Sequence, residues 1–157
     1  IPGRSSDCLL GGIAGLFARP AVTAEERAGA ESLFAPTGTT LWVAQESDLD
    51  AVTALSGSGP AYVFYFVEAM MQAAAEMGLT AAQGRQLALA TFDGATALAA
   101  ASKESPETLR AQVTSKGGTT HAAITALEEA DVKAAFVRAL HAARERAREL
   151  GDEFGSV

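Results

Sequence analysis

Residues 105–127, SPETLRAQVTSKGGTTHAAITAL, decide the fold, because they place a glycine pair between two segments that both favour helix. The serine, proline and glutamate that open the stretch are typical of a helix N-terminus, so we expect a short helix that ends at about Val113. Thr119 or Thr120 can cap a second helix that runs through Glu129. The stretch therefore predicts a helix, a glycine loop and a second helix.

The centre of this stretch, SKGGTT at residues 115–120, has the composition of a small anion-binding loop. Two adjacent glycines let the backbone approach a ligand, and the free N–H groups at the start of the second helix favour a carboxylate or a phosphate. Lys116 adds a positive charge nearby. The alternative is a plain connection between helices, in which the glycines only permit a tight turn. The residues alone leave both interpretations open.

Composition restricts the class of protein. The chain has 157 residues, 48% of them hydrophobic and 20% charged, which suits a folded domain rich in helix. Its net charge of −7 argues against a nucleic acid or an anionic membrane surface as a partner. The single cysteine, Cys8, excludes an internal disulfide, and no apolar run is long enough to span a bilayer. We expect a soluble, cytoplasmic protein.

Most of the remaining chain also reads as helix. Thr-x-x-Glu and Thr-x-x-Gln capping patterns predict helices after Thr23 and after Thr80, the second reaching about Ala101. Residues 13–17 and 39–44 suit short β-strands, and we expect the second to be an orphan edge that pairs with another copy. A short helix to Leu55 should break at the glycines that follow.

The segment over residues 60–77 is apolar around most of its circumference. A monomer of this length can hardly bury such a helix on every side, so we infer a partner subunit. The next helix should bury a face of mostly small residues, namely Leu87, Ala90, Thr91, Gly94 and Leu98. Asp131 should cap a last helix that ends before Gly151, with its arginines and glutamates on a solvated face. The predicted fold class is an all-α helical bundle with one or two short strands near the N-terminus.

Two segments resemble the pyrroline-5-carboxylate reductase family. The first is the spacing within residues 105–128, and the second is LSGSGPAY at residues 55–62, which opens a long apolar helix. The matched positions of the first segment are Pro106, Leu109, Val113, Thr114, Ser115, Gly117, Gly118, Thr120, Ala123, Ile124, Leu127 and Glu128. The resemblance covers roughly residues 18–154. It implies an interlocked homodimer, or a larger homo-oligomer, with a fold like the C-terminal domain of 6-phosphogluconate dehydrogenase.

The resemblance also implies a reaction and its residues. Hydride from NADPH or NADH would reduce 1-pyrroline-5-carboxylate to L-proline, the last step of proline biosynthesis. The substrate carboxylate would be held by the Ser115 hydroxyl and by the backbone N–H groups of Gly117, Gly118 and Thr119. Thr120 would hydrogen-bond the ring nitrogen, as an orienting catalytic residue, because a threonine hydroxyl is too weak an acid to be a tuned proton donor. Its alternative role is helix capping.

A nucleotide site is not expected in this chain. The family's Rossmann domain carries a G-x-G-x-x-G turn, which neither residues 11–15 nor residues 57–62 provide. A Met-Pro-Asn-Thr-Pro loop of the family is replaced by residues 1–5, IPGRS. We therefore expect residues 1–46 to be a remnant of a missing nucleotide-binding domain, and residues 47–157 to form the helical dimerisation and substrate-binding domain.

Two other hypotheses remain. The chain could be a catalytically inactive helical dimerisation module, or belong to a different imine or hydroxy-acid reductase with a similar two-domain plan. Negligible NADPH binding would favour the first, and different hydroxyls around Gly117 would be needed for the second. The two histidines, His121 and His141, read as surface or interface residues, and no acidic or histidine cluster has the spacing of a metal site.

Overall fold

The computed structural model describes residues 11–154 of the chain. These residues form two compact units, one of residues 11–60 with 138–154 and the other of residues 61–137. Cys8 and the IPGRS segment lie outside the described residues. The predicted boundary between residues 46 and 47 stays a prediction.

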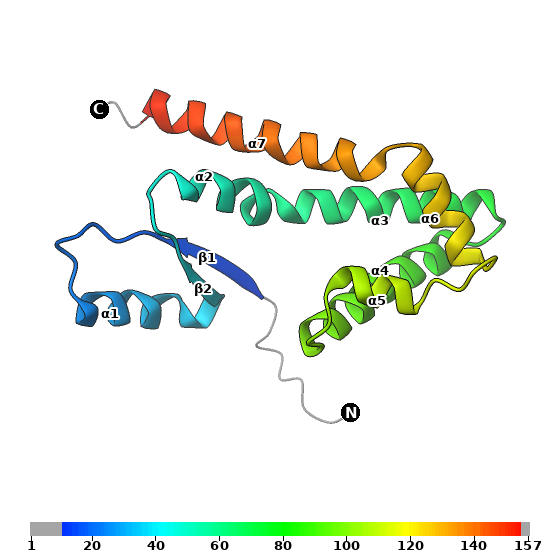
Figure 1. Ribbon diagram of the computed structural model, residues 1–157, viewed down its shortest axis with the longest axis horizontal. Coiled ribbons are helices and arrows are strands. Elements are labelled where there is room, and N and C mark those ends of the chain that lie inside the picture. Colours follow the sequence, from blue (N-terminus) through cyan, green and yellow to red (C-terminus); the bar gives the residue numbers. More distant parts are fainter. Residues whose placement is uncertain (1–10, 155–157) are drawn as a thin grey trace. The chain divides into compact units, whose positions relative to one another are not determined.

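The first unit contains a β-α-β arrangement, drawn in blue and cyan in Figure 1. Strand β1 (Gly12–Leu16) is followed by helix α1 (Ala24–Phe34), a 3₁₀ turn η1 (Ala35–Thr37) and strand β2 (Gly38–Trp42). The strands pair in parallel, from Gly12 opposite Gly38 to Leu16 opposite Trp42. The prediction of an orphan strand was therefore wrong, because the helix returns the chain to pair beside β1, as in any β-α-β unit.

Local contacts hold the helix and strands of this unit together. The predicted capping box is confirmed, since Thr23 Oγ1 accepts from the Glu26 N–H and the Glu26 carboxylate accepts from the Thr23 N–H. The Arg27 guanidinium lies 5.1 Å from the centroid of the Trp42 ring, whose Nε1 donates to Glu31. Two residues of α1 therefore fix the indole at the end of β2.

The predicted break after Leu55 is shorter than expected, because a wide helical turn precedes it. Helix α2 (Asp48–Val52) continues into a π-helical turn, η2 (Thr53–Gly57), and helix α3 (Gly59–Glu76) begins two residues later. The Ser58 N–H donates to the Thr53 carbonyl over 2.9 Å, which is the i to i+5 bond of a π-helix. The helical conformation therefore extends two residues past Leu55, and Ser58 separates it from α3, so a break between the two helices is present as predicted. Ala54, inside this turn, is buried.

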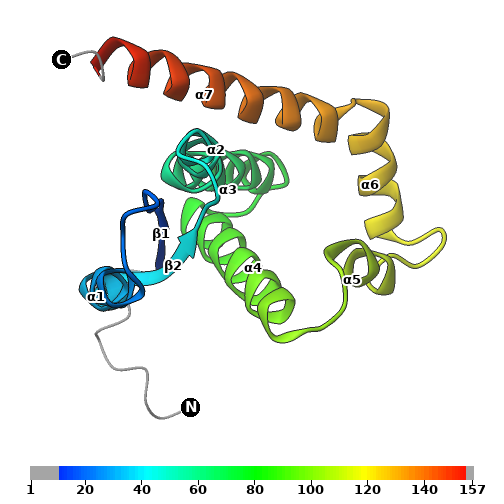
Figure 2. The ribbon, with the colours of Figure 1, turned by 60° about the vertical axis from the view of Figure 1, so that its left-hand side comes forward.

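In the second unit, α3 and helix α4 (Ala81–Ala101) form a hairpin, shown in Figure 2. Gly78, with a φ of +89°, makes the turn, and the predicted capping box of Thr80 and Gln83 is confirmed. Packing at the hairpin depends on Gly84, because a Cβ there would lie 3.0 Å from the Ala74 Cβ.

The predicted inner face of α4 was wrong for the single chain. Its buried residues are Gly84 and Ala88, whereas Leu87 and Leu98 of the predicted face are exposed. Helical periodicity identifies an apolar face, but α4 has apolar residues around most of its circumference. Close approach to α3 selects the face with the smallest side chains.

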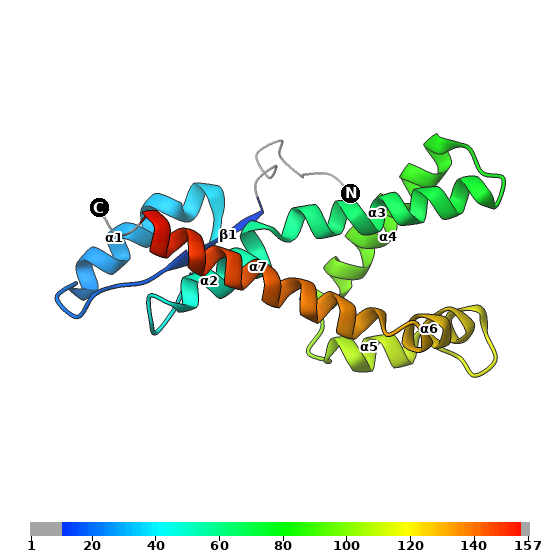
Figure 3. The same ribbon diagram turned by 90° about the horizontal axis from the view of Figure 1, so that it is seen from above.

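Three more helices complete the fold, as Figure 3 shows: α5 (Pro106–Gln112), α6 (Thr119–Glu129) and α7 (Val132–Phe154). Ser105 caps α5 as predicted, with its Oγ accepting from the Thr108 N–H over 3.2 Å. Asp131 separates α6 from α7 with a φ of +53°, a left-handed conformation that few residues other than glycine adopt. Helix α7 continues through Gly151 to Phe154, so its predicted end was too early.

Aromatic packing joins the start of α7 to α3 within the second unit. The Phe136 ring lies 5.7 Å from the Tyr62 ring and 5.6 Å from the Phe66 ring, centroid to centroid. Both pairs meet edge to face, at 87° and 70°, the arrangement that aromatic quadrupoles favour.

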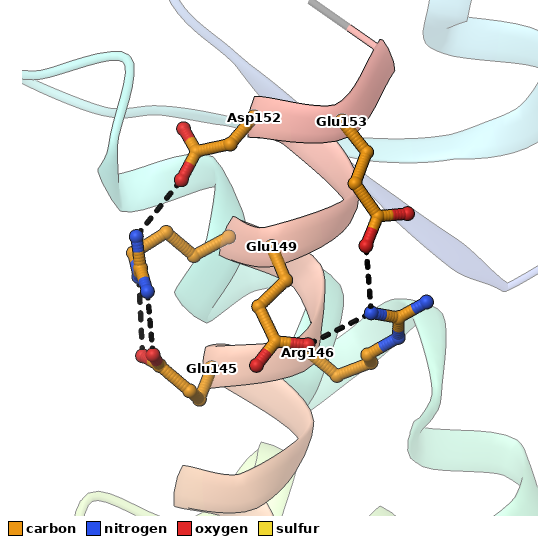
Figure 4. Close-up of polar contacts among 6 residues, drawn as sticks. Glu145, Arg146, Glu149, Asp152 and Glu153 are labelled. Atoms are coloured by element: carbon orange, nitrogen blue, oxygen red, sulfur yellow. Dashed lines mark hydrogen bonds and ion pairs between the residues drawn. The ribbon is translucent and has the colours of Figure 1, made fainter.

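The C-terminal part of α7, in the first unit, has a charged and exposed face (Figure 4). Its ion pairs join Arg146 to Glu149 and Glu153 at 2.8 and 3.2 Å, and Arg148 to Glu145 and Asp152 at 2.6 and 2.8 Å. The hydrogen bond from Arg148 and its positive charge lower the pKa of Glu145 below its ordinary value. The prediction of a solvated helix face is confirmed.

The single chain buries few hydrophobic residues. Among the described residues these are Ala54, Val67, Ala74 and Ala88. By contrast, large apolar side chains of α3 are exposed to solvent, Phe64 by 60% and Tyr65 by 70%. Exposed apolar area on this scale is typical of surfaces that another protein covers. No helix in residues 11–154 is long and apolar enough to cross a membrane.

Candidate functional site

The predicted glycine loop lies in the second unit, between α5 and α6. The chain leaves α5 at Val113 and reaches α6 at Gly118, and the Gly118 N–H donates to the Ser115 carbonyl over 3.0 Å. Gly117 between them has a φ of +75°, which costs a residue with a side chain about 1–2 kcal/mol. The first glycine is therefore required by backbone conformation.

The second glycine is required for a different reason. The φ of Gly118 is −82°, which any residue adopts, but a Cβ here would lie 2.5 Å from Ser115 Oγ and 3.2 Å from the Ser115 carbonyl oxygen. A side chain at residue 118 would therefore displace the serine hydroxyl. The absence of that side chain also leaves the backbone of the loop accessible next to this hydroxyl.

The start of α6 keeps its N–H groups available. Gly118 occupies the N-cap position and makes no side-chain capping bond, so the prediction that Thr119 or Thr120 caps this helix was wrong. Both threonines lie inside the first turn, where the N–H groups have no partner within the helix. The first turn of α6 contains no acidic residue, so the positive end of its dipole is not neutralised there.

The structure brings the predicted site residues together around this helix start. Ser115, Gly117 and Thr119 are exposed, and Gly118 and Thr120 are half-buried. Lys116 is exposed at the crest of the loop. Hydroxyl groups, a lysine and unpaired N–H groups can accommodate a small anion at this point.

The two helices that flank the loop are joined by a contact that the sequence analysis missed. Arg110 Nη1 of α5 lies 3.1 Å from Glu128 Oε1 of α6. The Arg110 carbonyl also accepts from Thr114 Oγ1 over 2.6 Å, and the Ala111 carbonyl accepts from the Thr114 N–H over 3.1 Å. The spacing of 18 residues between Arg110 and Glu128 does not predict a contact, because the pairing depends on how the loop between α5 and α6 brings these two helices together.

A cavity of about 570 Å³ lies beside this pair, within the second unit. Apolar residues and charges of both signs line it. The apolar residues include Phe66, Ile124, Leu127 and Phe136, and the charged ones include Glu107, Arg110, Glu128 and Lys133.

Other candidate residues stay isolated. His121 and His141 are both exposed, which agrees with their interpretation as surface or interface residues. Within residues 11–154, no three histidine, cysteine, aspartate or glutamate side chains gather as metal ligands would.

The fold defines a class of protein: a helical domain with exposed apolar faces and a glycine loop at an uncapped helix N-terminus. The model of one family, described as pyrroline-5-carboxylate reductase dimerisation, matches residues 46–150. The chain belongs to this family. The predicted resemblance and the predicted helical fold class are thereby confirmed.

Individual relatives agree with the family. A protein of Corynebacterium melassecola named pyrroline-5-carboxylate reductase is 45% identical over 130 residues, which are 83% of this chain and 48% of the relative. The structure of a pyrroline-5-carboxylate reductase from Coxiella burnetii has a TM-score of 0.84 and 41% identity, and the match covers 88% of this chain and 51% of the Coxiella chain. The structure of Plasmodium falciparum pyrroline carboxylate reductase with NADP bound has a TM-score of 0.81 and 28% identity. The match covers 92% of this chain and 59% of the Plasmodium chain. The chain thus spans about half the length of these relatives.

Proposed function

We propose that the chain supplies the dimerisation and substrate-binding part of a pyrroline-5-carboxylate reductase. The reaction would be the NAD(P)H-dependent reduction of 1-pyrroline-5-carboxylate to L-proline, which completes proline biosynthesis. Membership of the family supports this proposal. The structural observation that carries it is the uncapped N-terminus of α6 behind the glycine loop.

The carboxylate of the substrate would bind at this helix start. The Ser115 hydroxyl and the N–H groups of Gly117 and Thr119 are the proposed donors, whereas the Gly118 N–H, which the resemblance also implied, already donates to the Ser115 carbonyl. Hydrogen bonds from such donors to a carboxylate are charge-assisted and roughly twice as strong as neutral ones. The absence of a side chain at Gly118, which keeps the Ser115 hydroxyl in place, supports the assignment.

Thr120 would hydrogen-bond the ring nitrogen of the substrate. It lies in the first turn of α6, one residue beyond the proposed carboxylate donors. Its hydroxyl cannot supply a proton efficiently near neutral pH, so we assign it an orienting role, with the imine arriving protonated or water supplying the proton. Positioning of this kind lowers the barrier by holding the imine carbon in line with a hydride donor.

The hydride itself comes from a nicotinamide cofactor, NADPH or NADH, in the complete enzyme. The described residues do not fit a nucleotide. The glycines at residues 11–15 lie largely within β1 instead of in a turn after it, and the first turn of α1 contains Glu25 and Glu26, which would repel a pyrophosphate. We therefore assign the nucleotide to a domain formed by other residues of a longer protein, to which residues 1–46 would belong.

The functional unit would be a homodimer or a larger homo-oligomer of this chain. The description of the family and the exposed apolar residues of α3 and α4 support this assignment. We place the protein in the cytoplasm, since its single cysteine fits a reducing compartment.

The test is an NMR titration of this chain with L-proline, following the amide signals of Gly117, Gly118, Thr119 and Thr120. Saturable shifts confined to these amides are expected. The Gly118→Ala variant should weaken binding, whereas Gly94→Ala should not, because Gly94 has open space around it and no positive φ. Absence of shifts in a folded, associated sample would contradict an autonomous carboxylate site.

The second candidate is a catalytically inactive dimerisation module. It is favoured by the described residues, whose first strand and following helix offer no glycine-rich turn suited to a nucleotide. NADPH titration of the chain alone, and of the chain joined to the part of the Corynebacterium relative that it does not cover, separates the two. Reductase activity of the joined protein would support the enzymatic role, and its absence, with NADPH bound, would support the inactive module.

A further inference from the structure

We propose that the ion pair of Arg110 and Glu128 positions the glycine loop for carboxylate binding. This inference rests on the proposed function, because it concerns the site that would hold the substrate. The pair joins α5 to α6, the two helices whose ends hold the loop, with Arg110 Nη1 3.1 Å from Glu128 Oε1. Both residues act through the loop backbone, so they are positioning residues.

Helix α5 depends on few contacts for its place. It has seven residues, no buried one, and a capping bond from Ser105. A helix of this length is far too short to be stable alone in water. Loss of one contact with α6 therefore matters more for α5 than it would for a long, buried helix.

The pair closes a ring of interactions around the loop. The first step after Arg110 is Thr114. Its hydroxyl donates to the Arg110 carbonyl over 2.6 Å, and its N–H donates to the Ala111 carbonyl over 3.1 Å. One residue further, the Ser115 carbonyl accepts from the Gly118 N–H over 3.0 Å. Gly118 is the N-cap of α6, and Glu128 near the other end of α6 pairs with Arg110, which closes the ring. Every step of this ring except the ion pair is local in sequence.

Charges near the pair decide which variants can test it. Glu107, one turn before Arg110, and Lys133 line the same cavity. A reversed pair would place a glutamate at residue 110 next to Glu107, so charge reversal is a poor test. Arg110→Met removes the charge and keeps the apolar stem, and Arg110→Lys restores the charge.

The expected effect is modest, because the two side chains are 48% and 66% exposed. An exposed pair of this kind corresponds to at most about a fivefold change in an equilibrium. In Arg110→Met we expect amide hydrogen exchange at Thr114 and Gly118 to accelerate two- to fivefold, while exchange at buried Ala74 stays unchanged. The dissociation constant of L-proline should rise by a similar factor, and Arg110→Lys should restore both values.

Two controls make the test specific. Arg146→Met removes two ion pairs in the other unit, in which Arg146 is 55% exposed, and should leave loop exchange and L-proline affinity unchanged. In a Glu128→Gln background, Arg110→Met should have little further effect, because its partner charge is already gone. Unchanged exchange at Gly118, or faster exchange with unchanged L-proline affinity, would overturn the inference. Failure of the parent chain to bind L-proline would count against the proposed function, while the exchange data would still decide whether the pair holds the loop.

Discussion

Replacing Gly118 with alanine tests the geometry of the loop most directly. The new Cβ would lie 2.5 Å from Ser115 Oγ and 3.2 Å from the Ser115 carbonyl oxygen. The backbone conformation of residue 118 suits alanine, so the substitution introduces no backbone strain, and the clash with Ser115 adds to the smaller effects of alanine at an N-cap and in the unfolded chain. The Ser115 side chain must rotate away from its position in the structure, and the loop must shift by tenths of an ångström. Together these changes destabilise the fold by about 1 kcal/mol.

The same substitution should weaken L-proline binding more than it weakens the fold. A displaced Ser115 hydroxyl no longer donates to the carboxylate, and a hydrogen bond to a charged group contributes about 1.5–3 kcal/mol, or roughly 10- to 150-fold in the dissociation constant. Urea denaturation gives the stability, and titration monitored by NMR gives the affinity.

A double-mutant cycle with Ser115→Ala provides the decisive comparison. Without the hydroxyl, most of the clash disappears, so Gly118→Ala should destabilise the Ser115→Ala chain less than the parent. Equal destabilisation in the two backgrounds would refute the clash. An unchanged affinity of the parent chain after Gly118→Ala would refute the role of the hydroxyl in binding.

Three further predictions follow from other parts of the structure. Thr120→Ala, in the chain joined to the remaining part of the Corynebacterium relative, should lower turnover at least tenfold with the fold intact by circular dichroism; unchanged turnover would contradict the orienting role. In urea denaturation the Asp131→Gly chain should be more stable than the Asp131→Val chain by about 1–2 kcal/mol, because both variants lose the side-chain carboxylate and the φ of +53° favours glycine; equal stability would contradict the strain. Arg148 lowers the pKa of Glu145, so this pair stabilises the fold above the ordinary carboxylate pKa and the stabilisation is lost as pH falls through the lowered value. Glu145→Gln should therefore shift the thermal midpoint at pH 7 and have no effect at pH 2, and an equal shift at both would contradict the pairing.

Sequence predicted the elements whose signals are local. Capping boxes at Thr23 and Thr80 and the serine cap at Ser105 were confirmed, because each uses side chains within one helical turn. The wide turn over residues 53–57 and the extension of α7 past Gly151 were missed. Helix α7 continues through Gly151, and the turn before α3 extends to Gly57, so both helical segments end later than the sequence predicted.

Tertiary contacts account for the other misses. Which face of α4 packs on α3 depends on the fit of Gly84 against Ala74, which periodicity does not encode. In the candidate site, the glycines and their neighbouring hydroxyls were found from composition and resemblance. The contact of Arg110 with Glu128 was not, because it joins two helices across a turn whose closure no local pattern specifies.

The small hydrophobic core of the single chain has a thermodynamic consequence. Because Val67, Ala74 and Ala88 are the buried hydrophobic residues described in the second unit, the proposed homo-oligomer would draw much of its free energy of unfolding from surfaces that association covers. Folding and assembly then become a single equilibrium, in which mass action raises the unfolding midpoint as the protomer concentration rises. For such a chain dilution acts as a denaturant, and a substitution on an exposed apolar face of α3 would lower stability as effectively as one in the core.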